Sequence, residues 1–215
     1  MTRRWKIAQA LELQWWRNYQ RGKNPREYLT WKTNYWQNLI QQCGINVPAG
    51  ARVIDFGCGP AGIFIALPNA RVTALDPLLH QYSTCINFFF PADYPNVDFR
   101  NSPMEDFKAE GNYDIAFCMN AINHVADIEN AFDVLCKSVK PGGTVVVSID
   151  AHNYSFFKHL FRFIPGDALH PHQYDLAEYT QFLVHRGYSG VQPFLIKKEF
   201  FFSHFVLVAT KPAIV

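Results

Sequence analysis

Residues 53–62 read VIDFGCGPAG, an apolar run that leads directly into a glycine-rich turn. Glycines at positions 57, 59 and 62 favour such a turn, because a residue without a Cβ tolerates positive φ and lets a bound molecule approach the backbone. Asp55 stands near the end of the apolar run, where a charge is costly to bury unless something pairs with it. The stretch therefore predicts a buried strand whose end carries a ligand site.

Two classes of cofactor use a turn of this kind. The spacing satisfies G-x-G-x-x-G, the fingerprint of dinucleotide sites, in which a pyrophosphate binds backbone N–H groups at a helix N-terminus. A carboxylate at Asp55 would repel a pyrophosphate. It would suit a cationic ligand such as S-adenosylmethionine (SAM), which carries an amino group and a sulfonium. A glycine turn that binds no ligand is the remaining interpretation.

The composition suits one folded domain with an added cap. The chain has 215 residues, 49% of them apolar, and a net charge of +2, which is not a nucleic-acid signature. It shows no 18-residue apolar run and no signal-peptide core, so we expect a cytoplasmic protein without a transmembrane segment. The cysteines form no C-x-x-C motif and are typical of reduced core residues: Cys43, Cys58, Cys85, Cys118 and Cys136.

The order of predicted elements indicates an α/β fold. Apolar periodicity predicts helices over 4–20, 26–43 and 127–139, and strands over 51–56, 71–75, 97–100, 113–118 and 143–149. Asp175 and Glu178 fit a capping box for a helix that ends near His185, and strands near 191–197 and 203–210 form a hairpin. We predict a Rossmann-like, doubly wound, mostly parallel seven-stranded sheet with an antiparallel terminal hairpin.

The pattern predicts an N-terminal helical cap or lid over residues 1–48 and a SAM-binding domain over 49–215, with a substrate-side insertion at 150–174. The first 32 residues hold eight Lys or Arg and two Glu, which we interpret as a solvated helix face rather than a phosphate-binding arm. All five tryptophans lie in the cap. Trp16 and Tyr19 are candidate lid residues at the substrate, although packing against the sheet explains any single aromatic residue as well.

Several motifs give the chain a family resemblance. VIDFGCGPAG is followed by TALDP (73–77), SPMEDF (102–107), YDIAFCMNAINHV (113–125) and KPGGTVVVSI (140–149). In this order they resemble the motifs of the class I SAM-dependent methyltransferases, over roughly residues 50–210, and the terminal hairpin is similar to the reversed last strand of that family. The resemblance implies that SAM is the cofactor.

The resemblance also implies a set of cofactor residues. Asp76, at the end of the second strand, would accept hydrogen bonds from ribose hydroxyls, although dinucleotide sites use an acid in the same way and a turn cap beside Pro77 is an alternative. Pro103 stands where many family members have an acid, so the adenine contact would fall to Glu105 or Asp106. The full implied set is Asp55, Gly57, Gly59, Asp76, Met104, Glu105 and Asn120.

We interpret the chain as an enzyme that methylates a small molecule, with O-methylation and a histidine base favoured. His124 follows the fourth strand, and His170 and His172 lie in the HPHQY stretch of the insertion. For His124 a helix-start role stays open, and for the other two a polar loop. We predict no metal, although the H-x-H pair with Asp167 or His152 would offer ligands.

Other functions also fit the sequence. N- or C-methylation is open, and phenylalanine-rich stretches leave room for a lipid or quinone acceptor. A methyltransferase-like protein that binds SAM without turnover, or an NAD(P)-dependent oxidoreductase, would use a similar turn. We expect no nucleic-acid partner, and the sequence leaves the oligomeric state open.

Overall fold

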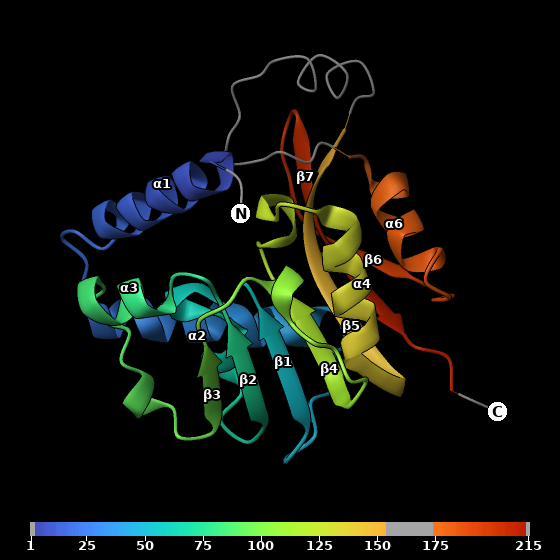
Figure 1. The fold of residues 1–215 in the computed structure, drawn as a ribbon, viewed down its shortest axis with the longest axis horizontal. Coiled ribbons are helices and arrows are strands. Elements are labelled where there is room, and N and C mark those ends of the chain that lie inside the picture. The colour runs from blue at the N-terminus through green and yellow to red at the C-terminus, as the bar shows by residue number, and fades with distance from the viewer. Residues whose placement is uncertain (1–2, 154–173, 214–215) are drawn as a thin grey trace.

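Seven strands form one mixed sheet in the order β3-β2-β1-β4-β5-β7-β6 (Figure 1). A computed structural model describes residues 3–153 and 174–213. Strands β1 to β5 pair in parallel, and β7 runs antiparallel to β5 and β6. This confirms the predicted fold class. The strands are β1 (Arg52–Phe56), β2 (Arg71–Leu75), β3 (Val97–Arg100), β4 (Tyr113–Cys118), β5 (Val139–His152), β6 (Gln192–Lys198) and β7 (Phe202–Thr210).

Helices cover both faces of the sheet (Figure 1). One face packs against α2 (Pro25–Gln42) and α3 (Leu79–Cys85), and the other against α4 (Ile128–Ser138) and α6 (Leu176–Val184). The first helix, α1 (Arg3–Tyr19), lies above α3 at the upper left in Figure 1 and contacts it. None of the helices in the described ranges combines the length and apolar character needed to cross a bilayer.

The inner strands β1, β2 and β4 are largely apolar because both faces of the sheet are covered there. Successive side chains of a strand point to opposite faces. On β1, Val53 joins the core beneath α2, and Ile54 joins the core beneath α4. In this second core Phe132 of α4 stacks on Phe182 of α6, with ring centroids 4.7 Å apart. Continuous apolar runs are typical of parallel strands buried in this way.

Short polar side chains fix the starts of three helices. The Asn24 side chain accepts hydrogen bonds from two backbone N–H groups at the start of α2. Asp127 accepts one in the same way at α4. At α6, Asp175 and Glu178 form the predicted capping box in both directions. Each cap satisfies N–H groups that the helix itself leaves without partners.

The glycine-rich turn after β1 does not open a regular α-helix. It leads into two 3₁₀ turns, η1 (Gly59–Ala61) and η2 (Ile63–Ala66). Gly62 separates them in an extended conformation, with φ −68° and ψ −176°. The N-terminus of a regular α-helix, which a dinucleotide site uses for its pyrophosphate, is therefore missing after β1.

The fifth strand is longer than the predicted strand over 143–149. It begins at Val139, which pairs with Tyr113, and the register then shifts before Thr144 pairs with Ile115. The segment Pro141–Gly143 forms this irregularity, with Gly142 at φ 76°. Pairing with β7 carries the strand to His152, so the irregular insertion predicted from residue 150 begins later. Most of that insertion, residues 154–173, lies outside the described residues.

One buried hydrogen bond joins α2 to the glycine-rich segment. The Trp36 indole Nε1 donates to the Ala61 carbonyl oxygen at 3.0 Å, and the Trp36 side chain is almost fully buried. Trp36→Phe should lower the free energy of unfolding by about 2 kcal/mol, because the buried carbonyl loses its donor and the smaller ring packs less well. Urea denaturation measures this change.

Trp31 on the same helix supplies the matched control, because it is exposed. Trp31→Phe should change the free energy of unfolding by no more than about 0.5 kcal/mol. Equal losses for the two variants would show that the bond to Ala61 does not anchor α2.

Candidate functional site

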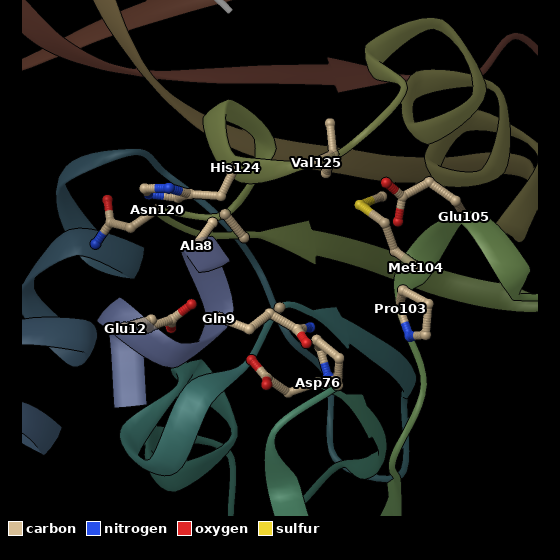
Figure 2. A pocket seen from close by; sticks show the side chains of 13 residues that line it. Ala8, Gln9, Glu12, Asp76, Pro103, Met104, Glu105, Asn120, His124 and Val125 are labelled. Atoms are coloured by element: carbon tan, nitrogen blue, oxygen red, sulfur yellow. The ribbon is translucent and has the colours of Figure 1, made fainter. Parts of the chain in front are cut away.

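A pocket opens at the carboxyl ends of β1, β2 and β4 (Figure 2). Gly57, Asp76 and Asn120 follow these three strands closely, and all three line the pocket. In open α/β sheets this edge is where ligands bind. We call it the main pocket; its lining consists of Ala8, Gln9, Glu12, Gly57, Asp76, Pro77, Pro103, Met104, Glu105, Asn120, Ala121, His124 and Val125.

The glycine at position 57 forms the floor of the main pocket. Its φ is 64°, and a Cβ added there would lie 2.3 Å from the Cβ of Ala121. Any larger residue would therefore collide with the opposite wall. Gly59, at φ 56°, turns the chain so that its N–H donates to Oδ2 of Asp76 at 3.0 Å. The turn thus brings bare backbone to the pocket and ties the end of β1 to the end of β2.

Asp76 is the buried acidic residue of the main pocket. Its other oxygen, Oδ1, accepts a hydrogen bond from the Leu78 N–H at 2.8 Å, and the residue is 5% exposed. Burial, followed by the charge of Glu12 on α1, raises the pKa of the Asp76 carboxyl well above its usual range. The structure places Asp76 where the sequence predicted it, although its role toward a cofactor stays a prediction.

Asp55 lies beneath the glycine turn and is absent from the lining of the main pocket. It is 1% exposed; Oδ2 accepts a hydrogen bond from the Phe64 N–H at 3.3 Å, and Oδ1 has no hydrogen-bond partner among the described residues. Burial raises the pKa of this carboxyl to about 7. A Cβ on Gly62 would lie 2.6 Å from Oδ2, so this glycine makes room for the acid. The structure assigns Asp55 a position under the turn, not on the pocket wall.

One end of the main pocket is apolar. Pro103, Met104 and Val125 lie at this end in Figure 2, and Met104 also belongs to the core beneath α4. The Glu105 carboxylate accepts a hydrogen bond from the Ala126 N–H at 2.7 Å, which holds it against the loop before α4. Glu105 lines the main pocket and one of its oxygens already has a partner; its contact with adenine stays a prediction.

Asn120 has an unusual backbone conformation. Among the described residues it is the only one other than glycine with a positive φ, 55°. Its N–H donates to Oγ of Ser148 at 2.6 Å, and this hydroxyl donates to Oδ1 of Asn120 at 3.1 Å. Such strain persists only where surrounding contacts fix it, and it concentrates at functional sites. His124, in the short turn η5 (Ile122–His124), lines the pocket beside it.

The first helix supplies a pocket wall that the sequence analysis missed. Ala8, Gln9 and Glu12 of α1 face the strand ends in Figure 2. The Tyr82 hydroxyl donates to Oε1 of Glu12 at 2.9 Å, which ties α1 to α3. The signal in the sequence was weak: Glu12 is the single acid among the basic residues of this helix. A single acid among basic residues indicates a specific interaction of its side chain.

The two predicted lid residues lie elsewhere. The Trp16 ring lies 3.8 Å from where a Cβ on Gly59 would be, and it packs among the aromatic rings of α3 and its surroundings. Tyr19 lies in a surface groove beside Tyr28, with the Lys23 ammonium 2.9 Å from its ring centroid. Neither residue lines the main pocket. The predicted bases His170 and His172 lie outside the described residues.

The charge of the main pocket selects among ligands. Glu12, Asp76 and Glu105 line it, and no Lys or Arg does among the described residues. An anionic pyrophosphate would find only repulsion there, whereas a cation or a set of hydroxyl donors would relieve the cost of the buried carboxylates. The carboxylates that line the main pocket thus fit a nucleoside that carries a sulfonium better than they fit a dinucleotide.

The main pocket is narrow in this structure. Its volume is about 90 Å³, below the range of about 300–1,000 Å³ that is usual for small-molecule sites. Because α1 forms one wall, an outward shift of α1 would widen the pocket without disturbing the sheet.

Comparison with known proteins agrees with this geometry. A family described as "Methyltransferase domain" matches residues 28–192. A curated relative named ubiquinone biosynthesis O-methyltransferase, from Azotobacter vinelandii, is 31% identical over 153 residues, which are 65% of this chain and 59% of the relative. The chain thus spans little more than half the length of that relative.

Solved structures share the fold. YcgJ from Bacillus subtilis matches with a TM-score of 0.66 and 15% identity, covering 83% of this chain and 99% of that protein. Phosphoethanolamine N-methyltransferase 2 from Haemonchus contortus, solved in complex with S-adenosyl-L-methionine, matches with a TM-score of 0.65 and 14% identity, covering 82% of this chain and 52% of that protein. At these identities the likeness shows the fold alone.

The buried Asp55 carboxyl gives a prediction about pH. Its pKa in the folded protein, about 7, lies above the ordinary value of 3.8, so its contribution to stability is full below about pH 4 and is lost as the pH rises through 7. Asp55→Asn keeps the shape and the acceptor for Phe64 but removes the charge. The free energy of unfolding of this variant relative to the wild type should rise between pH 5 and pH 8 by on the order of 2 kcal/mol.

Asp114→Asn is a matched control, because the pKa of the Asp114 carboxyl is shifted in the opposite direction. The hydrogen bond from Lys140 lowers the pKa of the Asp114 carboxyl, so its contribution is already full at pH 5 and does not change up to pH 8. Urea denaturation at the two pH values measures both variants. A parallel pH dependence of the wild type and Asp55→Asn would contradict the account of Asp55.

Proposed function

This chain belongs to the class I SAM-dependent methyltransferases, and from that premise we propose that it transfers the methyl group of SAM to a hydroxyl oxygen of a small molecule. The observation that carries the proposal is the main pocket itself, a carboxylate-lined cavity at the ends of β1, β2 and β4. Its negative charge complements the cofactor, and its position is the ligand-binding edge of the fold.

The cofactor residues predicted from the sequence have distinct tasks in this proposal. Asp76 would accept hydrogen bonds from ribose hydroxyls, and Asn120 would lie beside the methionine part. Met104 and Glu105 would border the adenine at the apolar end of the main pocket. Gly57 and Gly59 would let the cofactor lie against bare backbone. Asp55 would act through the turn that it supports.

SAM supplies a sulfonium, a leaving group that is already activated, so the protein mainly has to place the acceptor. Holding the reacting groups in line and free of water can lower the barrier by about 7–11 kcal/mol in favourable cases. The remaining task is to take the proton from the hydroxyl as the new bond forms. A histidine performs this near neutral pH.

The choice of a hydroxyl acceptor rests on the relatives, whose name specifies O-methylation in ubiquinone biosynthesis. Since this chain spans little more than half the length of the Azotobacter relative, the acceptor is a proposal. His124 is the predicted base that lines the main pocket. We also propose that residues 1–48 act as a cap on a SAM-binding domain over 49–215, since α1 forms a wall of that pocket.

Asp76→Ala tests the cofactor site. The variant should weaken SAM binding by about tenfold to a hundredfold, because hydrogen bonds to a charged carboxylate contribute about 1.5–3 kcal/mol. Isothermal titration calorimetry measures the dissociation constant, and circular dichroism checks that the variant is folded. Asp93→Ala is the control, because Asp93 is an exposed acid of the turn η3 (Pro91–Asp93).

The same titration separates the alternatives. A dissociation constant for SAM that is unchanged in folded Asp76→Ala would remove Asp76 from the site. Tighter binding of NADH than of SAM by the wild type would contradict the methyltransferase proposal. SAM binding without transfer to any component of a cell extract would favour a binding protein over an enzyme.

A further inference from the structure

A second cavity adjoins the main pocket. It has a volume of about 300 Å³, and Asn120 lines both. The rest of its lining comes from α2, from the carboxyl end of β5 and from the β6–β7 hairpin: Tyr35, Asp150, Lys197, Glu199, Phe202 and His204. A ligand in the second cavity would therefore lie across Asn120 from a ligand in the main pocket.

The second cavity contains a histidine held by a carboxylate. Asp150 on β5 and His204 on β7 are register partners, and Nδ1 of His204 lies 2.9 Å from Oδ1 of Asp150. A carboxylate can only accept, so Nδ1 carries the proton and Nε2 is the nitrogen with the lone pair. The imidazole is thus fixed in the tautomer that a general base needs.

Strand geometry places this pair close to the main pocket. Asp150 lies two residues after Ser148 on β5, so both side chains point to the same face of the sheet. Ser148 is the residue whose hydroxyl holds Asn120. A rise of about 3.3 Å per residue puts the Cα atoms of Ser148 and Asp150 about 7 Å apart. His204, the register partner of Asp150, therefore lies next to the boundary between the two cavities.

We propose that the second cavity binds the acceptor and that His204, held by Asp150, is the base that takes the hydroxyl proton. This inference rests on the proposed function and extends it. Nε2 of His204 takes the proton of the acceptor hydroxyl, the oxygen forms a bond to the methyl carbon, and the carbon–sulfur bond breaks. Its electron pair stays on sulfur, so the positive charge moves from the sulfonium to the imidazolium beside Asp150.

The lining also indicates the class of acceptor. Among the described residues, the charged side chains that line the second cavity have partners: Asp150 contacts His204, and Lys197 forms an ion pair with Glu199. Because these charges already neutralise one another, the second cavity does not favour a charged ligand. Tyr35 from α2 and Phe202 from β7 add aromatic rings. These features fit a neutral molecule with a flat ring that carries the hydroxyl.

His124 and His204 occupy different cavities. His124 lines the main pocket, where it would lie against the cofactor. His204 lines the adjoining cavity, where a hydroxyl would lie. A base must reach the proton that it removes. Of the two, His204 is the one that lines the second cavity, where the acceptor would lie.

The activity test uses deproteinised cell extract and methyl-labelled SAM, with the initial rate of labelled small-molecule product as the readout. His204→Gln should lower the rate by about 10²–10⁴-fold while its dissociation constant for SAM stays that of the wild type. Asp150→Asn should lower the rate less, because the imidazole remains. Added imidazole should restore part of the rate of His204→Ala, which a merely structural histidine would not allow. His185→Gln, at an exposed position at the end of α6, is the control.

A spectroscopic test does not depend on turnover. In histidine-labelled protein, the ring resonances of His204 are assigned by their absence from His204→Gln. They should shift when S-adenosylhomocysteine is added, since Asn120 joins the two cavities, and the resonances of His185 should not. In Asp150→Ala, which removes the acceptor, the Nδ1 proton of His204 should lose its hydrogen-bonded shift.

The outcomes are distinct. A wild-type rate in folded His204→Gln, or a loss confined to His124→Gln, would overturn the assignment of the base and leave the proposed function intact. His204 resonances that ignore S-adenosylhomocysteine bound with micromolar affinity would contradict the shared boundary at Asn120. A wild-type protein that binds SAM but labels no product would overturn the proposed function, and the inference with it.

Discussion

The hydrogen bond from the Gly59 N–H to the Asp76 carboxylate is the constraint on which the site depends. It joins the turn after β1 to the end of the neighbouring strand β2, beside the main pocket. The bond depends on two features of the turn. Gly57 and Gly59 have positive φ, and residue 57 must lack a Cβ because Ala121 lies close to it. Only glycine meets both at position 57. The turn is thus shaped by sterics and held by a buried charge.

That charge gives the site its selectivity. Asp55 beneath the turn and Asp76 beside it are both buried, and burial raises the pKa of each. Two backbone N–H groups support Asp76, and one supports Asp55 within hydrogen-bond distance. Neither has a cationic side chain as its partner among the described residues. A ligand that brings positive charge or hydroxyl donors recovers part of this desolvation cost, whereas a pyrophosphate increases it.

The residues that the sequence predicted well are those fixed by short-range rules. The strands β1 to β4, the helices α2, α4 and α6 and the capping box at Asp175 follow from periodicity and local hydrogen bonds, and their boundaries agree within one or two residues. Gly57, Asp76 and Asn120 follow from the rule that strand ends meet at one edge.

The missed residues depend on contacts between distant segments. Glu12 reaches the main pocket only because α1 crosses the sheet edge and bonds to Tyr82, 70 residues away. Asp55 reads as a wall residue in the sequence, yet the 3₁₀ turns fold over it. The His204–Asp150 pair depends on the register of two antiparallel strands 54 residues apart, and no local pattern encodes that register.

Asn120, at the boundary between the two cavities, combines a strained backbone with a side chain that fixes its position. A glycine would adopt φ 55° without strain, but it would lack the Oδ1 that accepts from Ser148. Asparagine tolerates this region better than other residues with a Cβ. Its side chain also accepts the hydrogen bond that fixes its position. Since Ser148 lies in β5, an interior strand paired on both sides, the boundary between the cavities is held by the sheet. Transfer between two bound reactants depends on how precisely their separation is held, and a residue anchored in this way supplies that constraint.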